Sequence, residues 1–129
     1  MSINKFTSTI LFVLFSLVAF VSALPVHIAR DVWDPPIISP NATTVWIVGQ
    51  KYNVTWNTTN PPSQITNTVG RVVLAANGLE DYENPLAANF SILLGSIEVT
   101  CPNVTAGNDY AIVLFGDSGN FSPNFTITN

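Results

Sequence analysis

Ser118, in the segment Gly116-Asp-Ser-Gly119, is the first candidate in this chain for covalent chemistry. Serine proteases present their nucleophile in a similar segment, but the hydroxyl attacks only when a histidine, held by a third group, takes its proton. The single histidine, His27, precedes the part of the sequence that is typical of a folded domain. We therefore interpret 116–119 as a turn between two strands, because glycine, aspartate and serine all favour turns.

Carboxylates are the second candidate, since a glycosidase needs two of them facing each other across a cleft. Glu80, Asp81 and Glu83 are neighbours in one expected loop, which does not supply two opposed groups. Asp109 and Asp117 bracket an expected strand, so they lie roughly 20 Å or more apart at about 3.3 Å per residue. No Cys/His spacing of a metal site and no calcium loop is recognisable. We expect no catalytic residue, metal or cofactor, and hence no enzyme.

Sequons for N-linked glycosylation are the third kind of chemistry, and they matter only in a secreted protein. Seven of them in so short a chain predict that several carry glycans. The alternative is that these residues are merely polar surface positions. The sequon at Asn120 is the poorest, because Pro123 follows its serine directly. The sequons begin at Asn41, Asn53, Asn57, Asn89, Asn103, Asn120 and Asn124.

Exposed tryptophans could bind sugars by stacking a ring face on pyranose C–H groups. Trp33, next to Pro35-Pro36, and Trp46 are the candidates for such a carbohydrate contact, whereas Trp56 fits the core. The alternative, which we favour, is that both rings pack inside the fold, because a tryptophan buries a large apolar area.

The first 23 residues have the pattern of a secretory signal peptide. Lys5 precedes an apolar run over 10–21, and Val21-Ser22-Ala23 supplies the small residues that signal peptidase requires. The run is shorter than the ~18 apolar residues of a membrane-spanning helix. We expect a signal peptide at 1–23, a short leader at 24–30 and one domain at 31–129, with no membrane anchor in the mature chain because no hydrophobic tail follows.

Charge narrows the choice of partners. The mature chain would carry three basic residues, Arg30, Lys51 and Arg71, against eight acidic ones, a net charge of −5. It has no basic patch, so nucleic acid and anionic membranes are not expected partners. Cys101 has no second cysteine to pair with inside the chain, and its alternation with Ile97 and Val99 predicts a buried thiol. The alternative is a disulfide to another chain.

The mature chain alternates short β-rich segments with turn signals and never sustains a helical period. Several short strands without a helix predict an all-β fold, an immunoglobulin or fibronectin type III-like β-sandwich of about seven strands. The segment 107–110, Gly-Asn-Asp-Tyr, resembles the tyrosine corner of such sandwiches. Strands are expected within 33–39, 43–48, 51–57, 70–76, 90–94, 96–101, 109–115 and 121–128.

Alternation along two of these strands predicts which side chains face solvent, since successive side chains point to opposite faces. Tyr52, Val54 and Trp56 would point inward, which turns Asn53 and Asn57 outward.

The last strand alternates in the same way, with Phe121, Pro123, Phe125 and Ile127 inward and Asn124 outward. The two strands belong to opposite sheets in an immunoglobulin-like topology. Glycans would then cover both flat faces and leave a binding site only at the loop ends or at an edge.

Four segments together resemble the fungal Ser/Thr-rich glycosylphosphatidylinositol-anchored membrane protein family. The N-terminal domain of this family is related to yeast cell-wall proteins needed for β-1,6-glucan assembly. The resemblance covers nearly all of 31–128, and the last segment is the most specific. The segments are Thr44–Gln50, Tyr52–Trp56, Gly95–Val99 and Gly107–Pro123.

The resemblance implies an extracellular immunoglobulin-like domain at the fungal cell wall or surface, with cell-wall polysaccharide or wall proteins as partners. It implies no catalytic motif. The Ser/Thr-rich stalk and anchor tail of longer members are absent from this sequence. We expect a secreted, N-glycosylated, non-enzymatic wall component. The alternatives are a β-glucan-binding module, which predicts exposed aromatic rings, and an accessory factor in glucan assembly, which predicts an acid pair across a cleft.

Overall fold

Ten strands and one turn of 3₁₀ helix form the described part of this computed structural model, residues 32–129. The expected signal peptide, the leader and His27 lie outside the described residues. Within residues 32–129 no helix is long and apolar enough to cross a membrane. The elements are β1 (Ile37–Ser39), β2 (Val45–Ile47), β3 (Lys51–Trp56), β4 (Val69–Ala76), β5 (Leu79–Glu80), β6 (Ala87–Ser91), η1 (Ile92–Leu94), β7 (Ser96–Thr100), β8 (Gly107–Phe115), β9 (Gly119–Phe121) and β10 (Phe125–Thr128).

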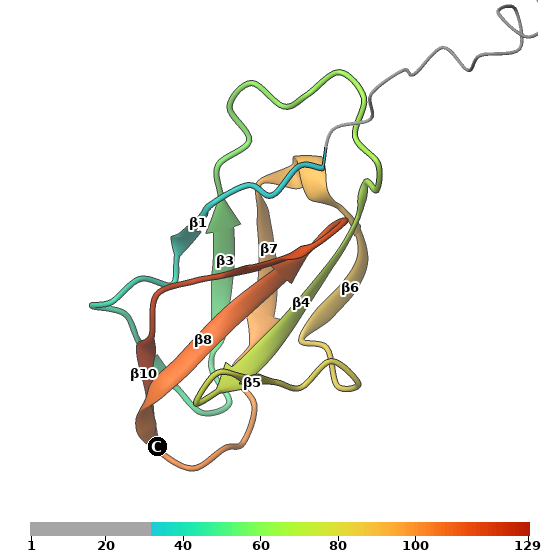
Figure 1. Cartoon of the computed structure of the whole chain (residues 1–129). Coiled ribbons are helices and arrows are strands. Elements are labelled where there is room, and N and C mark those ends of the chain that lie inside the picture. Colours follow the sequence, from blue (N-terminus) through green and yellow to red (C-terminus); the bar gives the residue numbers. More distant parts are fainter. Residues whose placement is uncertain (1–31) are drawn as a thin grey trace, which may run out of the picture.

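Two sheets pack face to face, as the sequence predicted for an immunoglobulin-like sandwich (Figure 1). The smaller sheet has the order β1-β3-β7, and the larger, seven-stranded sheet has the order β2-β10-β8-β4-β5, with β6 added to β4 and β9 added to β8. All strand pairs are antiparallel except β2 with β10. Strands β3 and β10, which carry sequons, therefore belong to opposite sheets, as expected.

The core is built where the two inner faces meet. Trp46 from β2 and Phe125 from β10 are each 1 % exposed, and Val54 and Trp56 reach them from β3 in the other sheet. The Trp56 indole is buried without cost because its Nε1–H donates to the Ile92 carbonyl at 2.7 Å. The inward face predicted for 51–57 is thereby confirmed.

The connection from β6 to β7 differs from the strand expected over 90–94. The strand ends at Ser91, whose Oγ accepts the Leu93 N–H at 3.2 Å and starts the short turn η1. Gly95 then ends η1 with φ +77°, a left-handed conformation that glycine adopts without steric strain. Local turn chemistry thus overrides the apolar β pattern of this segment, and only Phe90 and Ser91 of it lie in a strand.

The inward face predicted for the last strand is correct for only half of its residues. Phe125 and Ile127 are buried, but Phe121 is 48 % exposed and Pro123 is exposed. The reason is that Ser122 turns inward, where its Oγ accepts the Ile112 N–H at 2.9 Å and donates to the Pro123 carbonyl. This bond shifts the alternation by one residue and turns Phe121 onto the outer face.

A tyrosine corner closes the turn between β7 and β8, as the sequence predicted. Tyr110 is buried in the core, and its hydroxyl donates to the carbonyl of Thr105, five residues upstream. The bond holds the connection 101–106 against the end of β8 and satisfies a carbonyl that the turn leaves without a strand partner.

We expect Tyr110→Phe to lower the free energy of unfolding by about 1–3 kcal/mol, because it removes this bond and leaves the Thr105 carbonyl unpaired. Tyr82→Phe is the matched control, since Tyr82 lies on the surface and should change stability by less than about 0.5 kcal/mol. Urea unfolding, monitored by tryptophan fluorescence, measures the free energy of unfolding of both variants. Equal stabilities for the two variants would contradict a structural role for the corner.

Cys101 is a buried free thiol, 1 % exposed, which confirms the packing interpretation of the sequence. Burial raises the pKa of the thiol, because the thiolate is poorly solvated there. The thiol is therefore expected to react slowly with iodoacetamide in the folded chain at pH 8–9, and quickly once urea unfolds it, since the thiolate is the nucleophile. Mass spectrometry of the alkylated chain measures both rates; similar rates would show that the thiol is accessible.

Candidate functional site

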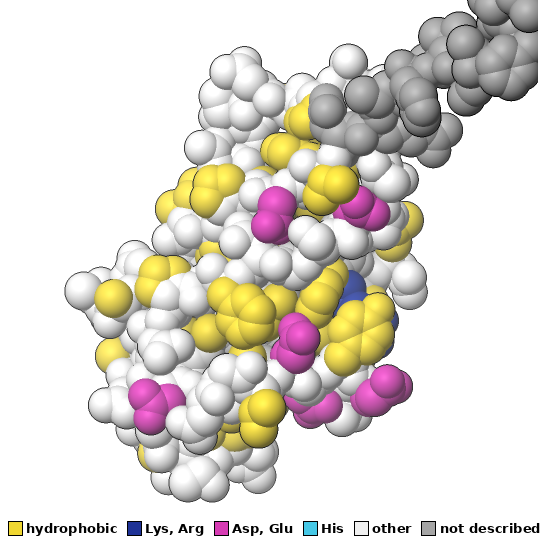
Figure 2. All heavy atoms as spheres, viewed as in Figure 1, with side chains coloured by type: hydrophobic (Ala, Val, Ile, Leu, Met, Phe, Trp, Pro, Cys, Tyr) yellow, Lys and Arg dark blue, Asp and Glu magenta, His cyan; other side chains and the backbone are white. Residues whose placement is uncertain are grey.

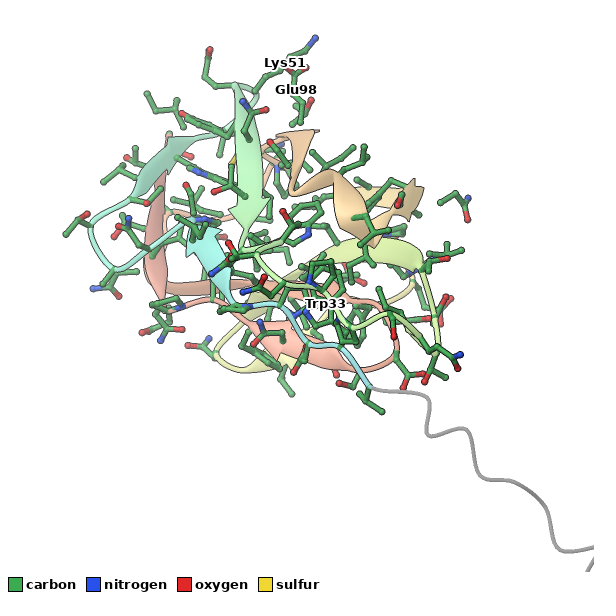
Figure 3. The ribbon with its side chains drawn as sticks, turned by 90° about the horizontal axis from the view of Figure 1, so that it is seen from above. Trp33, Lys51 and Glu98 are labelled. Carbon is green, nitrogen blue, oxygen red and sulfur yellow. The ribbon has the colours of Figure 1, made fainter. Side chains whose placement is uncertain are left out.

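The outer face of the smaller sheet is polar and carries two of the predicted glycosylation sites. Asn53 and Asn57 are exposed, and Asn53 lies in the centre of the sheet, opposite Glu98 of β7. Lys51 and Glu98 form an exposed ion pair at 3.9 Å on the same face, and they lie side by side in Figure 3. Such exposed pairs contribute little stability. Because Asn53 and Asn57 are exposed, sugars attached to them would not displace packed side chains.

Four further sequon asparagines are exposed and lie outside the central strands. Asn41 is in the turn between β1 and β2, and its Oδ1 accepts hydrogen bonds from Thr43 and Thr44. The other three lie in β6, in the β7–β8 connection and just before β10. They are Asn89, Asn103 and Asn124.

Asn120 differs from the other sequons because its side chain is part of the fold. It is half-buried in β9, and its Nδ2 donates to the Pro35 carbonyl, which ties the segment before β1 to the larger sheet. The serine of this sequon, Ser122, is buried, and its hydroxyl both accepts a hydrogen bond from Ile112 and donates one to Pro123. A glycan on Asn120 would have to break the bond to Pro35.

Trp46 does not fit the carbohydrate contact that the sequence suggested. Its ring stacks on Tyr52 at 5.0 Å between centroids and contacts Phe125 at 4.8 Å. Both faces are therefore covered by protein, as the large area of a buried indole favours. Trp33 is half-buried in the segment before β1, close to the body of the fold in Figure 3. Of these two rings, only Trp33 keeps accessible surface.

The residues considered for catalysis lie apart. Gly116–Gly119 is a turn between β8 and β9, in which the Gly116 N–H approaches the Ser118 carbonyl. Asp109 lies near one end of β8, and Asp117 lies just beyond the other. Within residues 32–129 no three His, Cys, Asp or Glu side chains are gathered in a way that could hold a metal ion.

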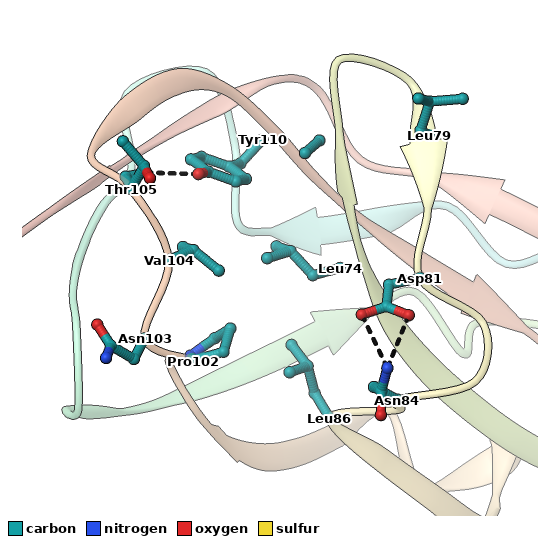
Figure 4. A pocket seen from close by; sticks show the side chains of 11 residues that line it. Leu74, Leu79, Asp81, Asn84, Leu86, Pro102, Asn103, Val104, Thr105 and Tyr110 are labelled. Atoms are coloured by element: carbon teal, nitrogen blue, oxygen red, sulfur yellow. Dashed lines mark hydrogen bonds between the residues drawn. The ribbon is translucent and has the colours of Figure 1, made fainter.

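A hollow of about 450 Å³ opens between the β5–β6 loop and the β7–β8 connection, beside the tyrosine corner (Figure 4). Leu74, Val104 and Tyr110 give it an apolar floor. Asp81 and Asn84 stand on its rim, where both carboxylate oxygens of Asp81 accept from Asn84 Nδ2 at 3.0 and 3.2 Å. The sequence did not point to this hollow, because its walls come from four separate segments.

The outer face of the larger sheet is less polar than the sequence suggested. Hydrophobic side chains gather across the middle of this face in Figure 2. Val45, Ile47 and Phe121 are exposed on it, and so is Tyr82, whose ring lies 4.4 Å from the Arg71 guanidinium. The exposed sequon asparagines of this sheet, Asn89 in β6 and Asn124 just before β10, lie away from the central strands β8 and β4. The coverage of both flat faces by glycans stays a prediction.

Comparison with known proteins gives the family. The model of the Kre9/KNH-like N-terminal Ig-like domain matches residues 39–127, from β1 to β10. The chain therefore belongs to the Kre9/KNH-like Ig-like domain family, a family associated with fungal cell-wall glucan. The resemblance inferred from the sequence to domains related to glucan assembly is thus confirmed.

Two other comparisons add little. No curated protein sequence matches the chain at a significant level. One solved structure, from work on Clostridium thermocellum CbhA fibronectin(III)-like modules, is 13 % identical with a TM-score of 0.36, and the match covers 73 % of this chain and 91 % of that chain.

Asn120→Ala is expected to lower the free energy of unfolding by about 1 kcal/mol, because it removes the bond to the Pro35 carbonyl. Asn124→Ala, the matched control on an exposed sequon, should change it by less than about 0.5 kcal/mol. Both are measured on unglycosylated protein, so that only the side-chain bond is tested. An equal effect of the two substitutions would show that the Asn120 bond does not contribute.

Proposed function

We propose that this chain is a secreted, N-glycosylated and non-enzymatic component of the fungal cell wall or cell surface, which supports the organisation of wall β-glucan. The match of the Kre9/KNH-like family model over 39–127 is the observation that carries this proposal. The signal-peptide pattern at 1–23 supports export, although these residues lie outside the described part of the chain.

The proposed absence of catalysis is supported by how the acidic side chains are arranged. Glu80 ends β5, and Asp81 and Glu83 follow it in the β5–β6 loop; all three are exposed, and of the three only Asp81 lines the hollow. A hydrolase of glycosidic bonds would need two carboxyl groups within about 5–10 Å on opposite sides of a sugar. The hollow is instead lined by one carboxylate and mainly apolar side chains.

Glycans at the exposed sequons suit a wall component with few charges. Only 9 % of the residues are charged, so attached sugars would supply the hydrophilic surface that the side chains do not. Six sequon asparagines are exposed, and we propose them as the occupied sites, with Asn120 unoccupied. The six are Asn41, Asn53, Asn57, Asn89, Asn103 and Asn124.

A polysaccharide-binding module remains the second candidate, and one observation favours it. Aromatic rings stay accessible at Trp33, at Tyr82 and at Phe121, so the fold does present surfaces on which a sugar ring could stack. Trp33 and Tyr82 are the residues to test, because these larger aromatic side chains also carry a polar group.

Deletion of the gene in its own host, with the wild-type chain restored as the control, tests the proposed function. We expect less alkali-insoluble β-glucan in the deletion strain. From the control strain we expect to recover the mature glycosylated chain in the medium or the wall fraction. Glycopeptide mass spectrometry of that chain reads the occupancy of the seven sequons. An unchanged wall, or a chain retained inside the cell without glycans, would contradict the proposal.

The same secreted chain, incubated with insoluble β-1,3-glucan, β-1,6-glucan and chitin, separates the two candidates. Saturable binding to one polymer that Trp33→Ala or Tyr82→Ala abolishes, and that the surface control Leu94→Ala preserves, would establish a carbohydrate-binding module. Leu94 is exposed on η1, so its loss leaves the rings untouched. The structural proposal predicts no binding that depends on these two rings.

A further inference from the structure

Strand β7 is the one long, regular sheet edge among the described residues that the fold leaves open. It has five residues and pairs only with β3 (Figure 1). The other edges are short or irregular. β5 has two residues, β1 has three and a shifted register, and β6 contains Asn89 with φ +59° beside another register shift. At β2 the Ile47 N–H is not available to an added strand, because it donates to the Tyr52 hydroxyl at 2.8 Å.

The register of β7 on β3 decides which backbone groups are free. The Trp56 N–H donates to the Gly95 carbonyl at 2.9 Å, and the Cys101 N–H donates to the Gln50 carbonyl at 2.9 Å. Hydrogen-bonded and non-hydrogen-bonded pairs alternate along an antiparallel ladder. The odd-numbered residues from 95 to 101 therefore direct their N–H and C=O groups to β3.

The even-numbered residues of β7 direct theirs away from the sheet. Ser96, Glu98 and Thr100 each present an N–H and a C=O at the open edge, at the two-residue spacing of a strand. Only another extended polypeptide offers donors and acceptors at that spacing, which is the basis of recognition by strand addition. The open edge therefore favours an extended polypeptide as its ligand.

The hollow begins just beyond the C-terminal end of β7. Its wall begins at Pro102, two residues after the end of β7, and continues to Leu86, one residue before β6 (Figure 4). Alternate side chains of an added strand would point over the gap between the sheets, towards Leu74 and Val104 on the floor. A hollow of about 450 Å³ has room for a large apolar side chain.

We propose that the edge of β7 and this hollow together bind an extended segment of another protein by strand addition. The segment places an apolar side chain in the hollow and a lysine or arginine opposite Glu98. The charge follows from the surroundings, since Asp81 stands on the rim and opposite charges stabilise directly paired cross-strand positions. Glu98 is exposed at the edge, and its ion pair with Lys51 is long, 3.9 Å, and exposed to solvent, so it leaves the carboxylate accessible to a second cation.

A second copy of this chain fits less well. In a symmetric antiparallel pairing of two β7 strands centred on Glu98, that glutamate would face its own copy, and like charges directly opposite destabilise a sheet. A glycan on Asn53 does not block the proposed partner, because Asn53 projects from the outer face whereas the edge lies in the plane of the sheet. Asn103 lines the hollow, so a glycan there would lie close to the proposed partner. The proposal is independent of the glucan-related function, and because Asn103 lines the hollow it is tested on the chain with and without its glycans.

Selection from a displayed library of short random peptides on the secreted chain, with and without its N-glycans, tests this proposal. Thr100→Pro is the key variant, because it removes one edge N–H while leaving every bond to β3 in place, and proline is tolerated on an edge strand. Glu98→Lys reverses the charge at the edge, and Glu83→Lys is the control for charge alone. The urea midpoint of each variant reports whether it folds.

We expect enriched peptides to alternate apolar with other residues and to carry lysine or arginine. Their binding should fall at least about tenfold, equivalent to about 1.4 kcal/mol, in Thr100→Pro and in Glu98→Lys but not in Glu83→Lys. Bound peptide should shift the methyl NMR signals of Leu74 and Val104. The proposal is overturned if no peptide is enriched, if folded Thr100→Pro binds the peptides equally, or if the shifts fall only on other surfaces.

Discussion

The stacking of Trp46 on Tyr52 is the interaction on which this sandwich most depends. The chain has one cysteine, so no internal disulfide can join the two sheets. Trp46 comes from the larger sheet and Tyr52 from the smaller one, and their rings lie parallel within 2°. The Tyr52 hydroxyl also accepts the Ile47 N–H, so the pair joins the sheets through both apolar area and a hydrogen bond. Phe125 completes the cluster from β10.

The two outer faces of the sandwich differ in chemistry, and this difference organises the surface. The smaller sheet shows solvent a charged and polar face with Asn53 at its centre, while the larger sheet exposes Val45, Ile47, Tyr82 and Phe121. Sugars on Asn53 and Asn57 would shield the first face but not the second. A wall component could therefore be hydrated on one side and keep the other side for contact with polymer or protein.

The edges of the sheets show a similar division. Most are protected by short length, by an irregular residue or, at β2, by the Tyr52 hydroxyl, and such protection limits unwanted strand pairing. β7 retains only Glu98 as protection. The hollow begins close to the end of β7, so the fold brings an open row of backbone groups and a concave apolar surface near one another.

The sequence by itself determined the all-β class, the inward face of 51–57, the buried thiol of Cys101 and the tyrosine corner at Tyr110. Each of these follows from local alternation or from a short motif, and so needs no knowledge of distant residues. Only the tertiary structure decided that Phe121 faces out, that Trp46 has no free ring face, and that Asn120 bonds to Pro35. These outcomes depend on which strands become neighbours, and so do the hollow and the open edge of β7. Long-range strand pairing follows from the packing of the whole chain and cannot be read from local alternation or short motifs.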